Sequence, residues 1–211
     1  MILYLTIITV AIIILSSLNI FFNMTSLEPL TTILMTTGIA VYEFCQDGIV
    51  AFLIHLLPSS MFDINKKIYN VSSGERKFYE KIKIRKWKDK VWELGSIGGF
   101  SKKNLQSSTD TSYLSKFLME SNKGVMVHII SCFTGFTALL IFPIECALSI
   151  TLPVAIINLL MNLPSLFILR YNTPKLMVLY KRAMRTSALK NKEAEKISDE
   201  ENLTTNNSVK A

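Results

Sequence analysis

KFLMESNKGVMVHIISCFTGFTALLIFPIECALSITLPVAIINLLMNLPSLFILRYNTPK, residues 116–175, decides the fold of this chain. A polar helix leads into two apolar arms, Val125 to about Ile144 and about Ala147 to Leu169, joined by a very short turn. Each arm is long enough to cross the ~30 Å hydrocarbon core of a bilayer at about 1.5 Å per residue. The sequence therefore predicts an antiparallel transmembrane hairpin, kinked at Pro143, Pro153 and Pro164.

The cations of the chain are confined to two segments. All 23 Lys and Arg of the 211 residues fall within residues 58–123 or 170–211, and residues 1–57 and 124–169 have none. Half of the residues are apolar, and the mean hydropathy is +0.35. These values are too apolar for an ordinary soluble domain and typical of several membrane spans. We therefore predict an integral membrane protein.

The net charge of +7 could also suggest a nucleic-acid partner. No nucleic-acid-binding motif accompanies the cations, and they flank apolar spans, so the positive-inside bias explains them. We predict no nucleic-acid partner and expect anionic lipid headgroups beside these segments. The cysteines have neither a disulfide nor a metal-ligand spacing, and we predict no metal and no cofactor. We expect small core residues at Cys45, Cys132 and Cys146.

Two further apolar runs precede the first basic segment. Residues 1–24 are uncharged, and they lack a basic n-region and a small-residue cleavage site, which favours a retained span over a signal peptide. Residues 30–57 are also long enough to span, but Glu43 and Asp47 interrupt them on one helical face. Either this run crosses the membrane with a functional carboxylate pair inside, or a half-inserted helix leaves both acids in a hydrated pocket.

The polar segment between the second and third spans predicts an interfacial helix. Apolar side chains recur there at three- and four-residue intervals, the pattern of an amphipathic helix in the headgroup plane: Phe78, Ile82, Ile84, Trp87 and Val91. Gly98 and Gly99, before two lysines, favour an ordinary turn over a phosphate cradle. After Pro174 we expect a basic amphipathic helix on the inner surface and, from about Asn191, a disordered tail.

These elements predict an all-α integral membrane protein with about four transmembrane helices. Residues 1–57 hold two spans, and residues 58–123 form a basic loop. Residues 124–176 form the hairpin with the expected active site, and residues 177–211 form the basic helix and tail. If both basic segments are cytoplasmic, an even number of spans must precede each, and two and two satisfy this. Both termini and the loop are then cytoplasmic.

The candidate site lies where the hairpin meets the inner surface. His128 is one turn inside the first arm and Arg170 directly follows the second, so we expect them at similar depth on one side of the bilayer. Histidine is the commonest general base, and Glu120 lies just over two turns earlier on the same face. Donors to a phosphate or a developing oxyanion would come from Arg170, Asn172 and Lys175. The alternative is that His128 is an interfacial anchor and Arg170–Tyr171 a snorkelling belt.

Three blocks of this chain carry a family resemblance. The first is Arg85-Lys86-Trp87-Lys88, the second is Glu120 followed by His128, and the third runs from Asn162-x-Pro164 into Arg170-Tyr171-Asn172-x-Pro174-Lys175. In this order they resemble the glycosyl-4,4′-diaponeurosporenoate acyltransferases, which finish staphyloxanthin-type carotenoids in bacteria. The resemblance covers roughly residues 50 to 185, and its last block is the most specific.

The resemblance implies a multi-pass acyltransferase of the bacterial cell membrane. It would place a fatty acyl group on a sugar hydroxyl of a glycosylated terpenoid or carotenoid acid. Its partners would be an acyl donor of acyl-CoA or acyl-carrier type, the glycosylated lipid acceptor and membrane lipids. His128, as general base, and Glu120 are the expected catalytic residues. The expected substrate-binding residues are Arg85, Trp87, Lys88, Arg170, Tyr171, Asn172 and Lys175.

The stretch around Glu43 and Asp47 is additional to the family pattern, which leaves room for an altered acceptor. Two interpretations from other classes stay open. A non-enzymatic membrane adaptor would use the basic loop and tail to dock a cytoplasmic partner or anionic lipid. A transporter component would use Glu43 and Asp47 as a proton relay.

Overall fold

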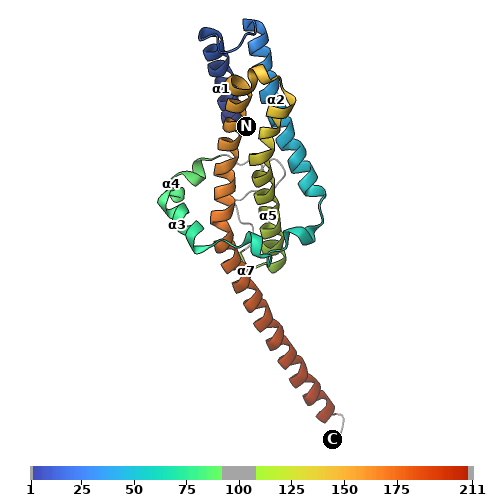
Figure 1. Ribbon diagram of the computed structural model, residues 1–211. Coiled ribbons are helices and arrows are strands. Elements are labelled where there is room, and N and C mark those ends of the chain that lie inside the picture. The colour runs from blue at the N-terminus through green and yellow to red at the C-terminus, as the bar shows by residue number, and fades with distance from the viewer. Residues whose placement is uncertain (1, 92–107, 209–211) are drawn as a thin grey trace.

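The computed structural model describes residues 2–91 and 108–208, and these contain helices and no strand. Four long helices form the body of the molecule (Figure 1): α1 (Ile2–Phe21), α2 (Pro29–Leu56), α5 (Thr111–Thr134) and α7 (Leu152–Ser208). Short helices fill the connections: η1 (Ser59–Phe62), η2 (Lys67–Tyr69), α3 (Ser73–Lys81), α4 (Ile84–Trp87), η3 (Lys88–Lys90), η5 (Gly135–Thr137), α6 (Ala138–Ile141), η6 (Ile144–Cys146) and η7 (Ala147–Thr151).

Three helical segments are long and apolar enough to cross a membrane: Pro29–Leu56, Thr111–Ile141 and Ile144–Glu193. A shorter apolar helix, Leu5–Phe21, accompanies them. The predicted all-α fold with about four apolar helices is thereby confirmed. Large apolar side chains are exposed along α1 and α2, among them Ile13, Phe21, Leu30 and Phe52. Such an exterior suits contact with lipid tails, which are as apolar as these side chains.

Helix α2 runs without interruption past Glu43 and Asp47. Its 28 residues extend about 42 Å, which is enough to cross a bilayer with both acids inside. Glu43 is 3% exposed, and Asp47 is half-buried. Of the two alternatives for this run, the continuous helix fits the crossing one.

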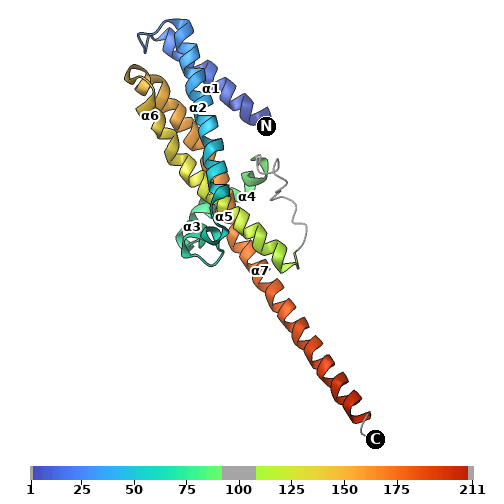
Figure 2. The same ribbon diagram turned by 90° about the vertical axis from the view of Figure 1, so that its right-hand side faces the viewer.

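The α5–α7 hairpin is antiparallel, as predicted, and the two helices lie side by side in both views (Figures 1 and 2). Two glycines on α5 and η5 set how closely they approach. A Cβ atom added at Gly124 would lie 3.1 Å from Leu169 Cδ1, and one added at Gly135 would lie 3.0 Å from Asn158 Nδ2. Small residues at such positions let helix backbones pack closely in membranes.

The three prolines of the hairpin behave differently from one another. Pro143 directly precedes η6 in the turn, where helix α6 has ended. Pro153 lies in the first turn of α7, a position that tolerates proline. Helix α7 continues through Pro164 and Pro174 without a break in its assignment. Of the three prolines, Pro143 interrupts the helical hairpin, and the kinks at Pro153 and Pro164 stay predictions.

The tail differs from its prediction, because α7 continues to Ser208 where disorder is expected from about Asn191. No Gly or Pro follows Pro174 in the sequence, and Ala, Leu, Lys, Arg and Glu, which favour helices, are frequent up to Glu201. The second half of α7 extends away from the bundle on its own (Figure 1).

The predicted helix is not continuous, because Lys83 separates α3 from α4 with a left-handed backbone, φ 52°. The break lets Trp87 Nε1 donate to the carbonyl oxygen of Ile82 at 3.0 Å. It also buries Ile84 against Tyr79 and Ile168 of α7. Packing against α7 thus overrides the local amphipathic pattern. The Gly98–Gly99 turn lies outside the described residues.

The start of the polar loop packs onto the bundle. Phe62 and Tyr69 are buried with Val50 and Ile54 of α2, and Asn122 Nδ2 of α5 donates to the Phe62 carbonyl oxygen at 3.0 Å. Residues 58–72 are therefore part of the folded body. Two of the cysteines, Cys132 and Cys146, are buried as predicted, whereas Cys45 is exposed.

Candidate active site

A polar cluster joins three helices inside the bundle. Glu43 and Asp47 come from α2, His128 comes from α5, and Asn158 and Asn162 come from α7. Both the two acids and the two asparagines are four residues apart, so each pair lies on one face of its helix. We call these five side chains the buried cluster.

The centre of the buried cluster is a chain of hydrogen bonds from His128 to Asp47. His128 Nδ1 lies 2.8 Å from Asn162 Oδ1, and Asn162 Nδ2 donates to Asp47 Oδ2 at 3.0 Å. Asn162 Nδ2 also donates to the backbone oxygen of Asn158 at 3.1 Å. Asn162 is only 7% exposed, so water does not compete strongly for these bonds.

This chain of hydrogen bonds determines which nitrogen of His128 carries the proton. A carboxylate and a backbone carbonyl can only accept, so the amino group of Asn162 must face Asp47 and Asn158. The amide oxygen of Asn162 then faces the imidazole, and His128 Nδ1 must be the donor. In the neutral ring Nε2 therefore carries the lone pair. An imidazole held in this way can accept a proton at Nε2.

Glu43 occupies the tightest place in the buried cluster. Its Oε2 accepts from Asn158 Nδ2 at 3.0 Å, and a Cβ atom added at Gly135 would lie only 2.7 Å from that oxygen. One turn along α2, Gln46 Nε2 donates to the Thr134 carbonyl oxygen at 2.7 Å, where α5 gives way to η5. A larger residue at position 135 would therefore require the Glu43 and Asn158 side chains to shift.

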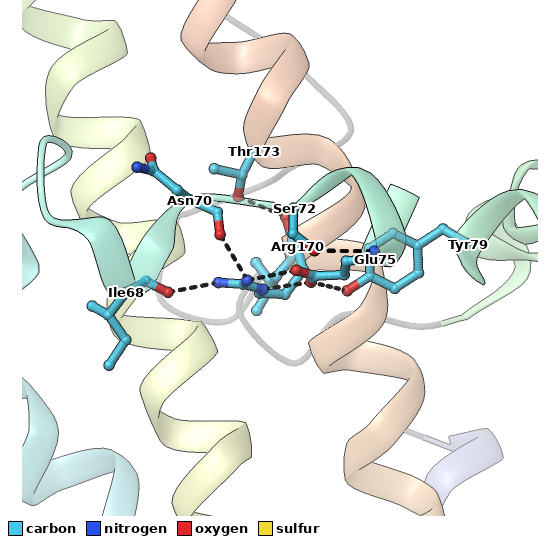
Figure 3. Close-up of polar contacts among 8 residues, drawn as sticks. Ile68, Asn70, Ser72, Glu75, Tyr79, Arg170 and Thr173 are labelled. Atoms are coloured by element: carbon cyan, nitrogen blue, oxygen red, sulfur yellow. Dashed lines mark hydrogen bonds and ion pairs between the residues drawn. The ribbon is translucent and has the colours of Figure 1, made fainter. Parts of the chain in front are cut away.

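A second polar network lies further along α7, around Arg170 (Figure 3). Arg170 donates to both carboxylate oxygens of Glu75 on α3, at 2.7 Å each. It also donates to the backbone oxygens of Ile68 at 3.0 Å and Asn70 at 3.1 Å. Tyr79 completes the network with a hydrogen bond to Glu75. We call these contacts the Arg170 clamp, because they tie residues 68–79 to α7.

Electrostatics in the Arg170 clamp favour an ionised Glu75. Burial raises the pKa of this carboxyl, but the hydrogen bonds from Arg170 and Tyr79 and the Arg170 charge outweigh it, so the pKa is lowered. The pKa of Tyr79 is raised, by burial first and then by its bond to Glu75. The clamp therefore holds its ion pair and its neutral phenol at neutral pH.

A family model described as glycosyl-4,4′-diaponeurosporenoate acyltransferase matches residues 58–182. This match covers more than half of the 211 residues. The chain belongs to this family of acyltransferases. In comparisons with curated proteins and with solved structures, none matches the chain. The resemblance seen in the sequence is confirmed, and the matched region holds His128, Asn162 and Arg170, whereas Glu43 and Asp47 precede it.

The acyltransferase family's second block, Glu120 and His128, does not form a contacting pair. Glu120 accepts from Lys123 Nζ at 2.8 Å and lies 3.8 Å from His55 Nε2 of α2. His128 instead contacts Asn162. Both residues lie on one uninterrupted helix, about 12 Å apart along its axis, so no bend brings them together.

The predicted similar depth of His128 and Arg170 is wrong. His128 lies opposite Asn162, and Arg170 is eight residues further along the same helix, about 12 Å along its axis. The prediction placed both residues by the ends of the two apolar runs, which differ in length. Their real depths depend on the register in which α5 packs against α7. Arg170 is also occupied by acceptors of its own chain. Arg170 was predicted to bind a phosphate, but in this arrangement its N–H groups are directed at Glu75, Ile68 and Asn70.

The other predicted substrate-binding residues gather beside the Arg170 clamp. Arg85 Nε donates to the Tyr171 hydroxyl at 2.9 Å, and Lys175 Nζ lies 3.3 Å from that hydroxyl and 4.3 Å from the ring centroid. We call these three side chains the tyrosine collar. Lys88 pairs with Asp89 at 2.8 Å. Trp87 packs in the cluster of Tyr79 and Ile84, and Asn172 is half-buried on α7.

Sequence reasoning finds Asn162 in the third block of the family resemblance but gives neither Asn158 nor Asn162 a role in the site. Two amides four residues apart within an apolar span repeat the spacing of the two acids on α2, and that match is a signal that could have found them. Among the described residues, no three His, Cys, Asp or Glu side chains come together in a way that could hold a metal ion.

Proposed function

We propose that this chain transfers a fatty acyl group to a sugar hydroxyl of a glycosylated carotenoid or related terpenoid acid. Membership of the acyltransferase family supports the reaction class. The observation that carries the proposal is the chain from His128 through Asn162 to Asp47, which leaves the Nε2 lone pair on a histidine held by three helices. General-base catalysis needs a group of this kind.

The proposed reaction has two proton transfers at His128. Nε2 takes the proton of the acceptor hydroxyl as its oxygen attacks the acyl carbon of the donor thioester. When the carbon–sulfur bond breaks, the imidazolium returns that proton to the leaving thiolate, and an ester remains. Asn162 Oδ1 accepts the hydrogen bond from Nδ1–H in every step, so the ring keeps its orientation.

The tyrosine collar is proposed to bind the charged part of the donor. Arg85 and Lys175 are exposed and carry positive charge beside Tyr171. Tyr171 lies nine residues beyond Asn162 on α7, about 13 Å along the helix. The donor must therefore hold its phosphate and its acyl carbon well apart. An acyl-CoA or an acyl carrier protein meets this requirement through its long flexible arm.

The proposed setting is a bacterial cell membrane, with both basic segments on the cytoplasmic side. The cations of the loop and of α7 would then face anionic lipid headgroups and the soluble donor. The acceptor would reach the buried cluster from the bilayer, because its terpenoid chain is apolar.

The two histidines of the chain offer a matched test. In a bacterial host supplied with the glycosylated carotenoid acid, mass spectrometry of lipid extracts should show a gain of one fatty acyl group with the wild-type chain. His55→Ala should retain this product, because His55 is exposed and its Nδ1 lies 2.8 Å from the backbone oxygen of Ala51. His128→Ala should lose it while remaining in the membrane. Wild-type product levels from His128→Ala would refute the proposal.

A non-enzymatic adaptor is a second candidate, because α7 extends from the bundle with exposed cations at Lys181, Arg182, Arg185, Lys190 and Lys192. This function predicts that charge reversal along α7 is damaging and that His128→Ala is silent. The same mass-spectrometric experiment therefore separates the two candidates.

A further inference from the structure

The two carboxyl groups of the buried cluster, Glu43 and Asp47, both lie within hydrogen-bond distance of the same amide nitrogen, that of Asn158. Asn158 Nδ2 lies 3.0 Å from Glu43 Oε2 and 3.5 Å from Asp47 Oδ1. No Lys or Arg occurs in residues 1–57 or 124–169, so these spans supply no countercharge. Two negative charges this close inside an apolar bundle are very costly. A single proton on the pair would remove one of these two charges.

The surroundings of the two carboxyl groups are unequal. Both oxygens of Asp47 have amide donors, Asn162 Nδ2 at 3.0 Å and Asn158 Nδ2 at 3.5 Å, and Asp47 is half-buried. Glu43 is 3% exposed, and its Oε1 is buried without a hydrogen-bond partner among the described residues. A charged oxygen without a donor costs far more to bury than a neutral one. The charge belongs on Asp47 and the proton on Glu43.

We propose that Asp47 is a positioning residue for His128, acting through Asn162, and that neutral Glu43 keeps Asp47 ionised. This inference rests on the proposed role of His128 as general base. An ionised Asp47 accepts only, so it holds the amino group of Asn162 away from the imidazole. Without that charge the amide can turn over and present its amino group to Nδ1. The ring proton would then move to Nε2, and the base would be lost.

The first test compares isosteric amides in the acyl-transfer assay. Asp47→Asn should lower the turnover rate at least about tenfold, as orienting carboxylates do elsewhere, with the donor concentration for half-maximal rate unchanged. Glu43→Gln, which imitates the neutral acid, should lower the rate clearly less than Asp47→Asn does. Membrane-inserted protein is quantified for each variant. Equal damage from Glu43→Gln would overturn the inference.

A double-mutant cycle tests whether Asp47 acts through Asn162. In an Asn162→Ala background, Asp47→Asn should cause no further loss, because the group it orients is gone. Losses that multiply would overturn the inference, since they would mean that Asp47 acts by another route.

The position of the proton can be read without any activity. Infrared spectra of the purified full chain in lipid vesicles at neutral pH should show the carbonyl stretch of a protonated carboxyl group. This band should persist in Asp47→Asn and vanish in Glu43→Gln. Its absence from the wild type, or its loss in Asp47→Asn, would overturn the assignment.

The failure of this inference differs from that of the proposed function. If His128→Ala retains full activity, the general-base proposal fails, and the infrared result still reports where the proton lies. If His128→Ala is inactive while Asp47→Asn is fully active, the function stands and the positioning role of Asp47 falls.

Discussion

The buried cluster and the Arg170 clamp are both polar networks built on α7, yet only one is complete. In the Arg170 clamp, the guanidinium and the Glu75 carboxylate pair at 2.7 Å, and backbone carbonyls take further donors. In the buried cluster, one oxygen of Glu43 has no partner among the described residues. Completely paired polar networks stabilise a fold, whereas incomplete buried ones need a functional explanation. We therefore assign structure to the clamp and chemistry to the cluster.

The largest effect on stability should come from breaking the Arg170 clamp. Arg170→Ala leaves the Glu75 carboxylate largely buried without its partner, which costs about 3 kcal/mol of unfolding free energy. Thermal unfolding in detergent should show a lower transition temperature, with earlier proteolysis of residues 58–91. Arg85→Ala is the control, because Arg85 is exposed. Equal transition temperatures for Arg170→Ala and wild type would contradict a structural role for the clamp.

A smaller loss should follow from crowding the buried cluster. Gly135→Ala places a methyl group 2.7 Å from Glu43 Oε2, and overpacking of this kind costs about 1–3 kcal/mol. Gly48→Ala is the matched control on α2, because no atom lies within 4 Å of its added methyl group. That change should be neutral or stabilising, since Ala favours helices over Gly. If both variants unfold at the same temperature, the cluster is not tightly packed.

The tyrosine collar should affect donor binding more than turnover. Arg85→Ala removes an exposed cation and the hydrogen bond to Tyr171. Initial-rate measurements should show a donor KM about threefold to tenfold higher, with kcat unchanged, as expected when uniform binding is lost. Lys77→Ala, an exposed cation on α3, serves as the control. A fall in kcat with constant KM would place the collar in the chemistry instead.

The smallest effect should be the pH dependence of the Arg170 clamp. The pKa of Glu75 is lowered from 4.5 in the folded chain, so its ion pair stabilises the fold above that value. This stabilisation is lost as the pH falls below 4.5 and through the folded-state pKa. Unfolding measured against pH should therefore show a weaker acid dependence in Glu75→Gln than in wild type. Identical slopes would show that Glu75 does not contribute.

The apolar spans could be predicted because they depend on composition and charge segregation, which are properties of the sequence alone. The chemistry of His128, Glu43 and Asp47 could also be suspected from their positions in these spans. The link from His128 to Asp47 through Asn162 could not be predicted, because the register of α5 against α7 depends on close packing at Gly124 and Gly135.

The partner of Arg170 was equally hidden from sequence reasoning. Glu75 lies 95 residues earlier, and it reaches Arg170 only because the loop folds back onto α7. The prediction of one continuous helix in the loop failed for a related reason. Burial of Ile84 and Trp87 against α7 favours the left-handed turn at Lys83 over a continuous helix.

The most direct test of the account is acyl transfer per membrane-inserted molecule in His128→Ala and Arg170→Lys. Arg170→Lys cannot form the two-pronged pair with Glu75, so fewer molecules should insert and fold. Each inserted molecule should still transfer acyl groups at nearly the wild-type rate, whereas inserted His128→Ala should transfer none. Full transfer per molecule by His128→Ala, with none by Arg170→Lys, would reverse the assignment and place the chemistry at the Arg170 clamp.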